Sequence, residues 1–154
     1  VRMKEMVDNY IRVSVRKVVG FTQTLANDRD FISGVNRGRV NLPEGLLRNN
    51  NVSGLYVYDK DGLNIYSSGY NLKRDYITHV SDDYRRWLSR LVQRINEDKK
   101  QHNILKFDKT DLAFFVKENK SLDFFAVVKL YNYAGYKGEL IVKMSFNSHF
   151  FNTV

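Results

Sequence analysis

The apolar positions of residues 3–33 recur with the period of a long amphipathic helix. Steps of four and three residues alternate along one face, which is the spacing of a coiled-coil seam, and the residues at these steps are Ile11, Val15, Val18, Thr22 and Leu25. We therefore expect a helix over about residues 1–35. Its broad side would pack on its own domain, while Ile11, Val15, Val18 and Leu25 face a second copy of the chain in a homodimer. A helix docked only on its own core is the alternative.

Two alternating strands joined by a tight turn are predicted at residues 52–68. Aromatic and aliphatic residues of the first strand fall on opposite faces, with Tyr56 and Tyr58 on one side and Leu55 and Val57 on the other. In the turn Asp59-Lys60-Asp61-Gly62, Gly62 can adopt a positive φ. The Asp59 carboxylate can accept hydrogen bonds from the turn backbone, so we interpret it as a turn residue.

A second helix and further strands follow. Ser81 is a good N-cap for a helix over residues 82–100, whose expected buried residues are Tyr84, Trp87 or Leu88, Leu91 and Ile95. Strand-like runs occupy residues 104–107, 112–118, 124–131 and 139–146. The order helix, two strands, helix, three or four strands predicts an α+β fold. It consists of an antiparallel sheet of about five strands with a long N-terminal helix and helices packed on one side.

Length and charge limit the domain organisation and the partners. A chain of 154 residues can bury one continuous core, so we expect a single domain over residues 1–154. The net charge is +8, but basic residues never exceed two in a row and acidic residues interrupt them throughout. A nucleic-acid-binding face concentrates positive charge instead. This pattern favours a solvated basic surface over an anionic partner such as a lipid headgroup, an acidic ligand or a nucleic acid, and we expect no nucleic-acid partner.

Side chains that could support catalysis or bind a metal do not form a known pattern. The absence of cysteine excludes disulfides, thiolate metal ligands and a cysteine nucleophile. The three histidines, His79, His102 and His149, stand far apart in the sequence, which also lacks a nucleophile elbow, a P-loop and a dinucleotide-binding glycine turn. We therefore expect neither an enzyme, nor a metal site, nor a cofactor.

Three features resemble the extracytoplasmic PAS-like sensor domains called Cache domains: the order of elements, the hairpin motif from Gly54 to Gly62, and a closing strand at residues 138–145. Such domains occur in bacterial histidine kinases, chemoreceptors and diguanylate cyclases. The resemblance implies a PAS-like core over residues 52–146 preceded by the long helix at residues 1–35. It also implies a periplasmic domain, cut from between two membrane spans of an inner-membrane protein.

The resemblance further implies a small ligand, such as an amino acid, a carboxylate or an amine, between the sheet and the helices beyond the hairpin. Amino-acid-binding members carry an R-x-W-Y motif, and this chain has Arg85-Arg86-Trp87-Leu88, with Leu88 in place of the tyrosine. Trp87 and Arg85 could hold a carboxylate by stacking and a bidentate hydrogen bond. The alternative is that Trp87 is a core anchor and Arg85 a surface residue.

The remaining candidate ligand residues are tyrosines and one aspartate. Tyr76, Tyr84 and Tyr131, together with Tyr133 and Tyr136, could line a polar-aromatic pocket, because each has an apolar ring and a hydrogen-bonding tip. Asp123 could hold a ligand amine, with a turn carboxylate as the alternative. The sequence thus predicts a small-molecule sensor domain. Two rival hypotheses are a dimerisation or partner-binding module whose core is filled by phenylalanines, and a cytoplasmic PAS domain.

Overall fold

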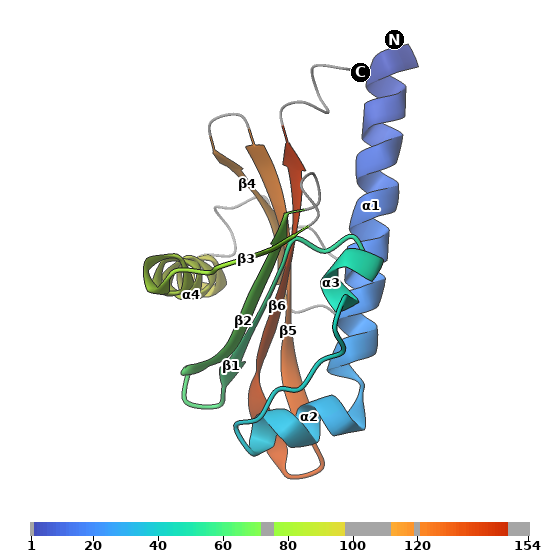
Figure 1. The fold of residues 1–154 in the computed structure, drawn as a ribbon. Helices are drawn as coiled ribbons and strands as arrows, with labels where there is room; N and C mark the ends of the chain where they lie inside the picture. Colours follow the sequence, from blue (N-terminus) through green and yellow to red (C-terminus); the bar gives the residue numbers. More distant parts are fainter. Residues whose placement is uncertain (1, 72–75, 98–111, 119–120, 148–154) are drawn as a thin grey trace.

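The computed structural model describes residues 2–71, 76–97, 112–118 and 121–147, and these form the predicted α+β fold (Figure 1). The helices are α1 (Arg2–Ala26), α2 (Arg29–Asn36), α3 (Leu46–Asn49) and α4 (Asp82–Glu97). The strands are β1 (Gly54–Asp59), β2 (Asn64–Asn71), β3 (Tyr76–Thr78), β4 (Leu112–Glu118), β5 (Ser121–Asn132) and β6 (Gly135–Asn147). In the part of the chain that the structure describes, no helix combines the length and the apolar character needed to cross a membrane.

Within the described residues, the sheet has six antiparallel strands in the order β3-β2-β1-β6-β5-β4. About five were expected, and the unpredicted strand is β3, whose three residues are too few to show a periodic pattern. The strand predicted at 112–118 is confirmed at both ends, and β5 and β6 are longer than predicted. The strand predicted at 104–107 lies outside the described residues. The two hairpins, β1–β2 and β5–β6, meet where β1 pairs with β6.

Helices cover both faces of the sheet, which corrects the expectation that they pack on one side. Figure 1 shows α1, α2 and α3 on one face and α4 on the other. Two apolar clusters follow from this arrangement: Leu55 and Val57 of β1 point into the cluster beneath α1, and Tyr56 and Tyr58 into the cluster beneath α4. The alternation read from the sequence is therefore confirmed, but each of its two faces is buried.

The long N-terminal helix is interrupted at residues 27–28, where a single helix over residues 1–35 was expected. The Asn27 side chain donates a hydrogen bond to the Gln23 carbonyl at 2.8 Å. The Asp28 carboxylate accepts one from the Phe31 N–H at 2.9 Å and so caps α2. Short polar side chains that bond to nearby backbone favour helix ends over helix interiors, and two in succession end α1 here.

The seam predicted for a homodimer faces the domain's own sheet. Val15 and Val18 are 5% and 1% exposed, and the Thr22 hydroxyl, also buried, bonds to the Val18 carbonyl at 2.7 Å. Ile11 and Leu25 are partly buried against the same cluster. Val15 and Val18 are therefore buried by the domain's own core, as the alternative expected, which corrects their assignment to a dimer contact. For Ile11 and Leu25, which are only partly buried, the dimer contact stays a prediction. Periodicity reports that a helix face is buried, but it does not tell what covers that face.

The β1–β2 turn has the predicted geometry. Oδ1 of Asp59 accepts hydrogen bonds from the backbone N–H groups of Asp61 and Leu63, both at 2.9 Å. Gly62 has a φ of +83°, which a glycine adopts without steric cost. These local interactions fix the register of the hairpin, and they leave Asp59 committed to the turn.

Helix α4 begins as predicted and is joined to the sheet by a buried tyrosine. The Ser81 hydroxyl accepts a hydrogen bond from the Tyr84 N–H at 3.1 Å and caps the helix. Its buried residues are Leu88, Val92 and Ile95. The Tyr58 hydroxyl donates a hydrogen bond of 3.0 Å to the Arg85 carbonyl. Burial, with a smaller contribution from the charge of Glu139, raises the pKa of Tyr58 to about 12.

We predict that Tyr58→Phe lowers the free energy of unfolding at neutral pH by about 1 kcal/mol, the typical net value of one hydrogen bond. The variant should also reduce the alkaline loss of stability. Above pH 10 the unfolded chain releases a phenolic proton that native Tyr58 retains. The contribution of Tyr58 to the free energy of unfolding therefore falls until the pH reaches about 12. Urea denaturation from pH 7 to pH 12 measures both effects, and equal alkaline slopes in the two proteins would contradict the assignment.

Candidate functional site

The sheet surface that faces α4 changes from apolar to polar along the strands. Neighbouring strands place paired residues side by side, and the row beneath the helix is apolar: Tyr56, Ile141, Val127 and Leu112. In the next row on the same face, Lys143 of β6 pairs with Gly54 of β1, and Gly54 pairs with Gly69 of β2. One row further, Asp123 of β5 pairs with Ser145 of β6. The α4 face thus contains a charged, small-residue region beside its core.

Lys143 is the centre of this region. Its ammonium Nζ donates a hydrogen bond of 3.1 Å to the Tyr84 hydroxyl and lies 4.7 Å from the centroid of the same ring. The Tyr84 ring in turn packs against Tyr56, at 5.8 Å between centroids, and against Trp87, at 5.3 Å. Aromatic rings stabilise a neighbouring cation through their quadrupoles. The half-buried positive charge of β6 is therefore held by Tyr84 of α4, whose ring packs against Tyr56 of β1.

The Tyr56 hydroxyl completes the polar group. Burial raises the pKa of Tyr56 well above its usual value, a hydrogen bond with Tyr84 opposes this, and the nearby charge of Asp123 raises the pKa further. The phenol therefore stays protonated at physiological pH and can both donate and accept hydrogen bonds. We call Lys143, Tyr56, Tyr84, Trp87 and Asp123 the Lys143 cluster.

Two glycines leave the sheet surface beside the cluster free of side chains at their own positions. A Cβ atom added to Gly54 would collide with the Tyr56 hydroxyl, and one added to Gly69 would collide with the Thr78 hydroxyl. Glycine in a strand interior commonly marks a close approach of another group. Here the closely approaching groups are two hydroxyls, so the glycines allow polar atoms to lie directly on the sheet.

Three of the six predicted ligand residues contribute to this cluster: Tyr84, Trp87 and Asp123. Arg85 does not, because it points to another side of α4. It forms an ion pair with Asp82 and lines a groove of about 530 Å³ between α4 and the β1–β2 hairpin. Arg85 and Trp87 therefore do not form the expected shared binding site for one carboxylate.

The two remaining predicted residues lie elsewhere or are only partly described. Tyr131 lies near the far end of β5, where its ring packs against Tyr136 at 5.7 Å between centroids. It is thus separated from Asp123 by most of the strand, which corrects the expectation of one pocket lined by both. Tyr76 belongs to β3 and pairs with Asn71 of β2.

Sequence reasoning missed Lys143 and did not assign Tyr56 to a site. The available signal was a single charged residue in the strand-like run Leu140-Ile141-Val142-Lys143-Met144, at a position that alternates with buried aliphatic residues. A lysine at such a position can lie beneath a helix only if polar groups form hydrogen bonds or charge interactions with it. Those partners come from β1 and α4, so their convergence required the fold.

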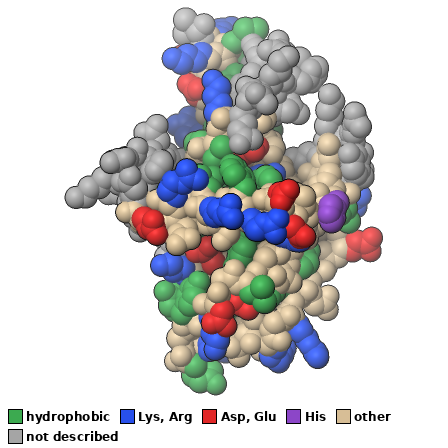
Figure 2. Space-filling model, turned by 90° about the vertical axis from the view of Figure 1, so that its left-hand side faces the viewer, with side chains coloured by type: hydrophobic (Ala, Val, Ile, Leu, Met, Phe, Trp, Pro, Cys, Tyr) green, Lys and Arg blue, Asp and Glu red, His purple; other side chains and the backbone are tan. Residues whose placement is uncertain are grey.

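The charge on this side of the molecule is mixed. Figure 2, which faces α4, shows basic and acidic side chains interspersed across the surface instead of a basic stripe. Within the described ranges, no group of three or more His, Asp or Glu side chains is placed to hold a metal ion. The Lys143 cluster offers an ammonium donor, two phenols, an indole and a carboxylate.

Comparisons with known proteins give a structural match only. No family model matches the sequence, and no curated protein matches it. A solved structure, described as the extracellular domain of the "putative histidine kinase vpHK1S-Z8", matches with a TM-score of 0.50 at 9% sequence identity. The alignment covers 99% of this chain and 61% of that one, so the chain spans about three fifths of the length of its neighbour. At this identity the likeness concerns the fold, and this chain shares its α+β fold with that extracellular domain.

Proposed function

We propose that this chain is the ligand-sensing, extracytoplasmic domain of a membrane-bound signalling protein, such as a histidine kinase, a diguanylate cyclase or a chemoreceptor. The fold shared with the extracellular domain of a histidine kinase supports this class. The observation that carries the proposal is the Lys143 cluster, because it places a half-buried ammonium group, buried phenols and a carboxylate on one face of the sheet, and such groups gather at binding sites.

The proposed ligand is a small organic molecule with a carboxylate, an amine or both. Lys143 and the phenols of Tyr84 and Tyr56 would donate hydrogen bonds to a carboxylate, and these are strengthened by the positive charge. Asp123 would accept hydrogen bonds from an amine on the same face of the sheet. The role of the site is binding, and we assign it no catalytic step.

The signal would pass through β6 to α1. Lys143 faces α4, while its neighbours Val142 and Met144 are buried in the cluster beneath α1. Near the end of the same strand, the Phe146 ring contacts Tyr10 of α1 at 6.1 Å between centroids. A ligand with different affinities for two positions of β6 would shift the packing of α1. This arrangement would couple the ligand site to the N-terminal helix.

A filled core favours a second candidate, a dimerisation or partner-binding module without a small ligand. Phe114 and Phe125 stack at 5.3 Å between centroids and are both buried beside Lys143 on the α4 face. In that case the Lys143 cluster would be structural, and the sheet beneath α4 would have no room for a molecule.

A thermal-shift screen of amino acids, carboxylates and amines separates the two candidates. We expect at least one compound to raise the melting temperature. At a hundredfold excess of ligand over Kd, the free energy of unfolding should rise by about 2.7 kcal/mol. Lys143→Gln should abolish that shift, because the carboxylate loses its charged donor. Lys60→Gln, at the exposed β1–β2 turn, is the matched control and should keep it. If no compound stabilises the wild-type chain, the partner-binding module is the correct candidate.

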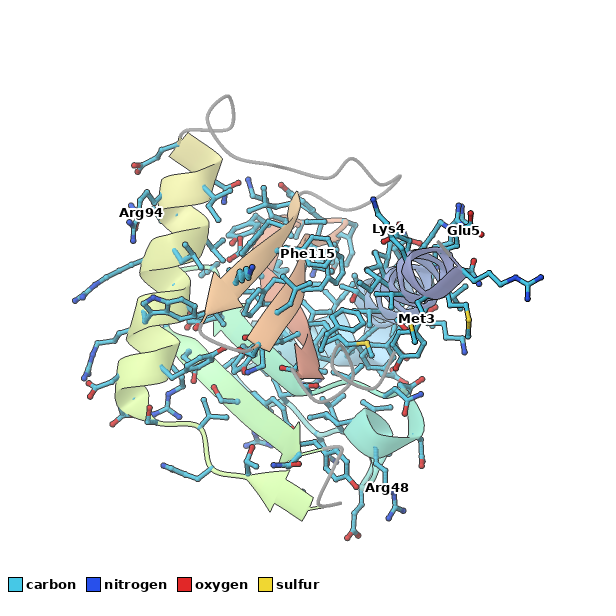
Figure 3. All side chains as sticks on the ribbon, turned by 90° about the horizontal axis from the view of Figure 1, so that it is seen from above. Met3, Lys4, Glu5, Arg48, Arg94 and Phe115 are labelled. Atoms are coloured by element: carbon cyan, nitrogen blue, oxygen red, sulfur yellow. The ribbon has the colours of Figure 1, made fainter. Side chains whose placement is uncertain are left out.

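We propose that the homodimer predicted from the sequence forms through a different face of α1. Met3, Met6, Tyr10 and Val13 are 62%, 64%, 44% and 41% exposed, and they recur at steps of three and four residues. This spacing again fits a coiled-coil seam. Figure 3 shows Met3 on a different side of the helix from Lys4 and Glu5. Burying it against a second copy would remove exposed apolar surface from water.

Cysteine crosslinking in the intact membrane protein tests this dimer. The chain has no cysteine of its own, so Met6→Cys, Val13→Cys and Lys4→Cys each introduce a single thiol here. We expect oxidation to give disulfide-linked dimers for Met6→Cys and Val13→Cys and at least tenfold less for Lys4→Cys. Equal crosslinking at all three positions, or none at the stripe, would exclude it as the interface.

A further inference from the structure

A second groove lies at the opposite end of the sheet from the Lys143 cluster. It has a volume of about 710 Å³, within the range of small-molecule sites. One wall is the β5–β6 turn and the other is the α1–α2 junction with α2, and its polar lining includes Asn27, Ser33, Asn36, Tyr131, Asn132 and Tyr133. Figure 1 shows this turn beside α2, at the pole away from the start of α1 and the end of β6.

Within the described residues, the Tyr133 side chain takes no part in the hydrogen bonds of the turn that carries it. The turn is built by Asn132, whose Oδ1 accepts a hydrogen bond of 2.7 Å from the Ala134 N–H, and by Gly135, whose φ is +120°. Tyr133 itself is 103% exposed, where a small polar residue would serve the turn equally well. Tyr131 beside it is 55% exposed. Two aromatic rings therefore face the solvent at one wall of a groove.

The orientation of Tyr131 depends on an irregularity in the hairpin. The pairing of β5 with β6 shifts register between Leu130 and Tyr131, which re-aims the side chains at the end of the strand. Leu130 points into the cluster beneath α1, whereas Tyr131 packs against Tyr136 and lines the groove. The groove wall is thus a defined feature of the sheet end.

The other polar groups of the groove are mostly uncharged. Asn36 supplies an amide, which can donate and accept hydrogen bonds, and Ser33 supplies a hydroxyl. The amides of Asn27 and Asn132 also line the groove, although one is partly engaged by the Gln23 carbonyl and the other by the Ala134 N–H. Arg29 is the one charged residue in the lining, and Asp28 and Asp30 flank it in the sequence. The Asp28 carboxylate is engaged by the Phe31 N–H. This balance gives little attraction for an anion and suits a neutral ligand with many hydroxyls.

We propose that this groove binds a neutral oligosaccharide. The apolar C–H face of a pyranose ring would pack on the exposed rings of Tyr133 and Tyr131. Its hydroxyl groups would exchange hydrogen bonds with Asn36 and Ser33 on α2. A protein partner fits less well, because interface cores are more apolar, and the aliphatic residues here are only Ala26 and the buried Ile32. The proposal stands independently of the Lys143 cluster.

Saturation-transfer NMR with the 154-residue chain tests the proposal. The probes are the neutral tetrasaccharides of β-1,4-linked N-acetylglucosamine, β-1,4-linked glucose and α-1,4-linked glucose. We expect at least one to bind, and Tyr133→Ala to weaken it at least tenfold while leaving the melting temperature unchanged. Tyr133→Phe should keep most of the affinity, because stacking requires the ring and not the hydroxyl. Leu63→Ala, which truncates an exposed apolar residue in the other hairpin turn, is the matched control and should bind as wild type.

Three results would overturn the proposal. The first is that none of the three saccharides binds at millimolar concentration. The second is that a saccharide binds equally well to Tyr133→Ala, which would place it elsewhere. The third is that a protein partner binds at the groove and no saccharide competes with it for binding. The Lys143→Gln variant distinguishes the two proposals, because it lacks the proposed sensor site and retains the groove. It should therefore still bind the saccharide.

Discussion

The structure depends on one strand whose two faces are both buried. β6 pairs with β1 on one side and with β5 on the other, so it joins the two hairpins into one sheet. Leu140, Val142, Met144 and Phe146 enter the core beneath α1, whereas Ile141 enters the core beneath α4. Because side chains alternate between faces, a register slip of one residue would exchange the two cores and bury Lys143 beneath α1. The hydrophobic pattern of β6 therefore fixes the whole layer arrangement.

Lys143 is the exception in that pattern, and its surroundings explain how the sheet accommodates it. A methionine at the same place would avoid the cost of desolvating an ammonium, and apolar replacements of buried ionic groups are often neutral or stabilising. The lysine is tolerated because Tyr84 offers both a hydroxyl and a ring, and because Gly54 beside it leaves the surface low. Stability alone thus does not require a lysine at this position, yet Tyr84 satisfies its charge. This combination is the chemical basis of the sensor proposal.

Local interactions determined which parts of the fold could be predicted from the sequence. The β1–β2 turn and the start of α4 were predicted correctly because Asp59, Gly62 and Ser81 act within a few residues. The face on which α4 packs could not be predicted, since periodicity identifies a buried helix face and not its partner. The same limit explains why Val15 and Val18 were assigned to a dimer seam, although they face the domain's own sheet. At the candidate site, Tyr84 and Trp87 lie one helical turn apart in the sequence, but Lys143 joins them only because α4 packs on the sheet. Arg85 was misassigned because one helical step turns a side chain by about 100°.

The two proposed sites lie near opposite ends of one hairpin. Asp123 and Tyr131 are eight positions apart on β5, roughly 26 Å at the rise of a β-strand. One small molecule cannot reach both, so the two sites would recognise different ligands. Helix α1 packs along β5 and β6 between them. Since α1 contacts the same two strands that carry both sites, a movement of this hairpin caused at either end would act on the same helix. The long pairing of β5 with β6, irregular only between Leu130 and Tyr131, would allow one helix to respond to both.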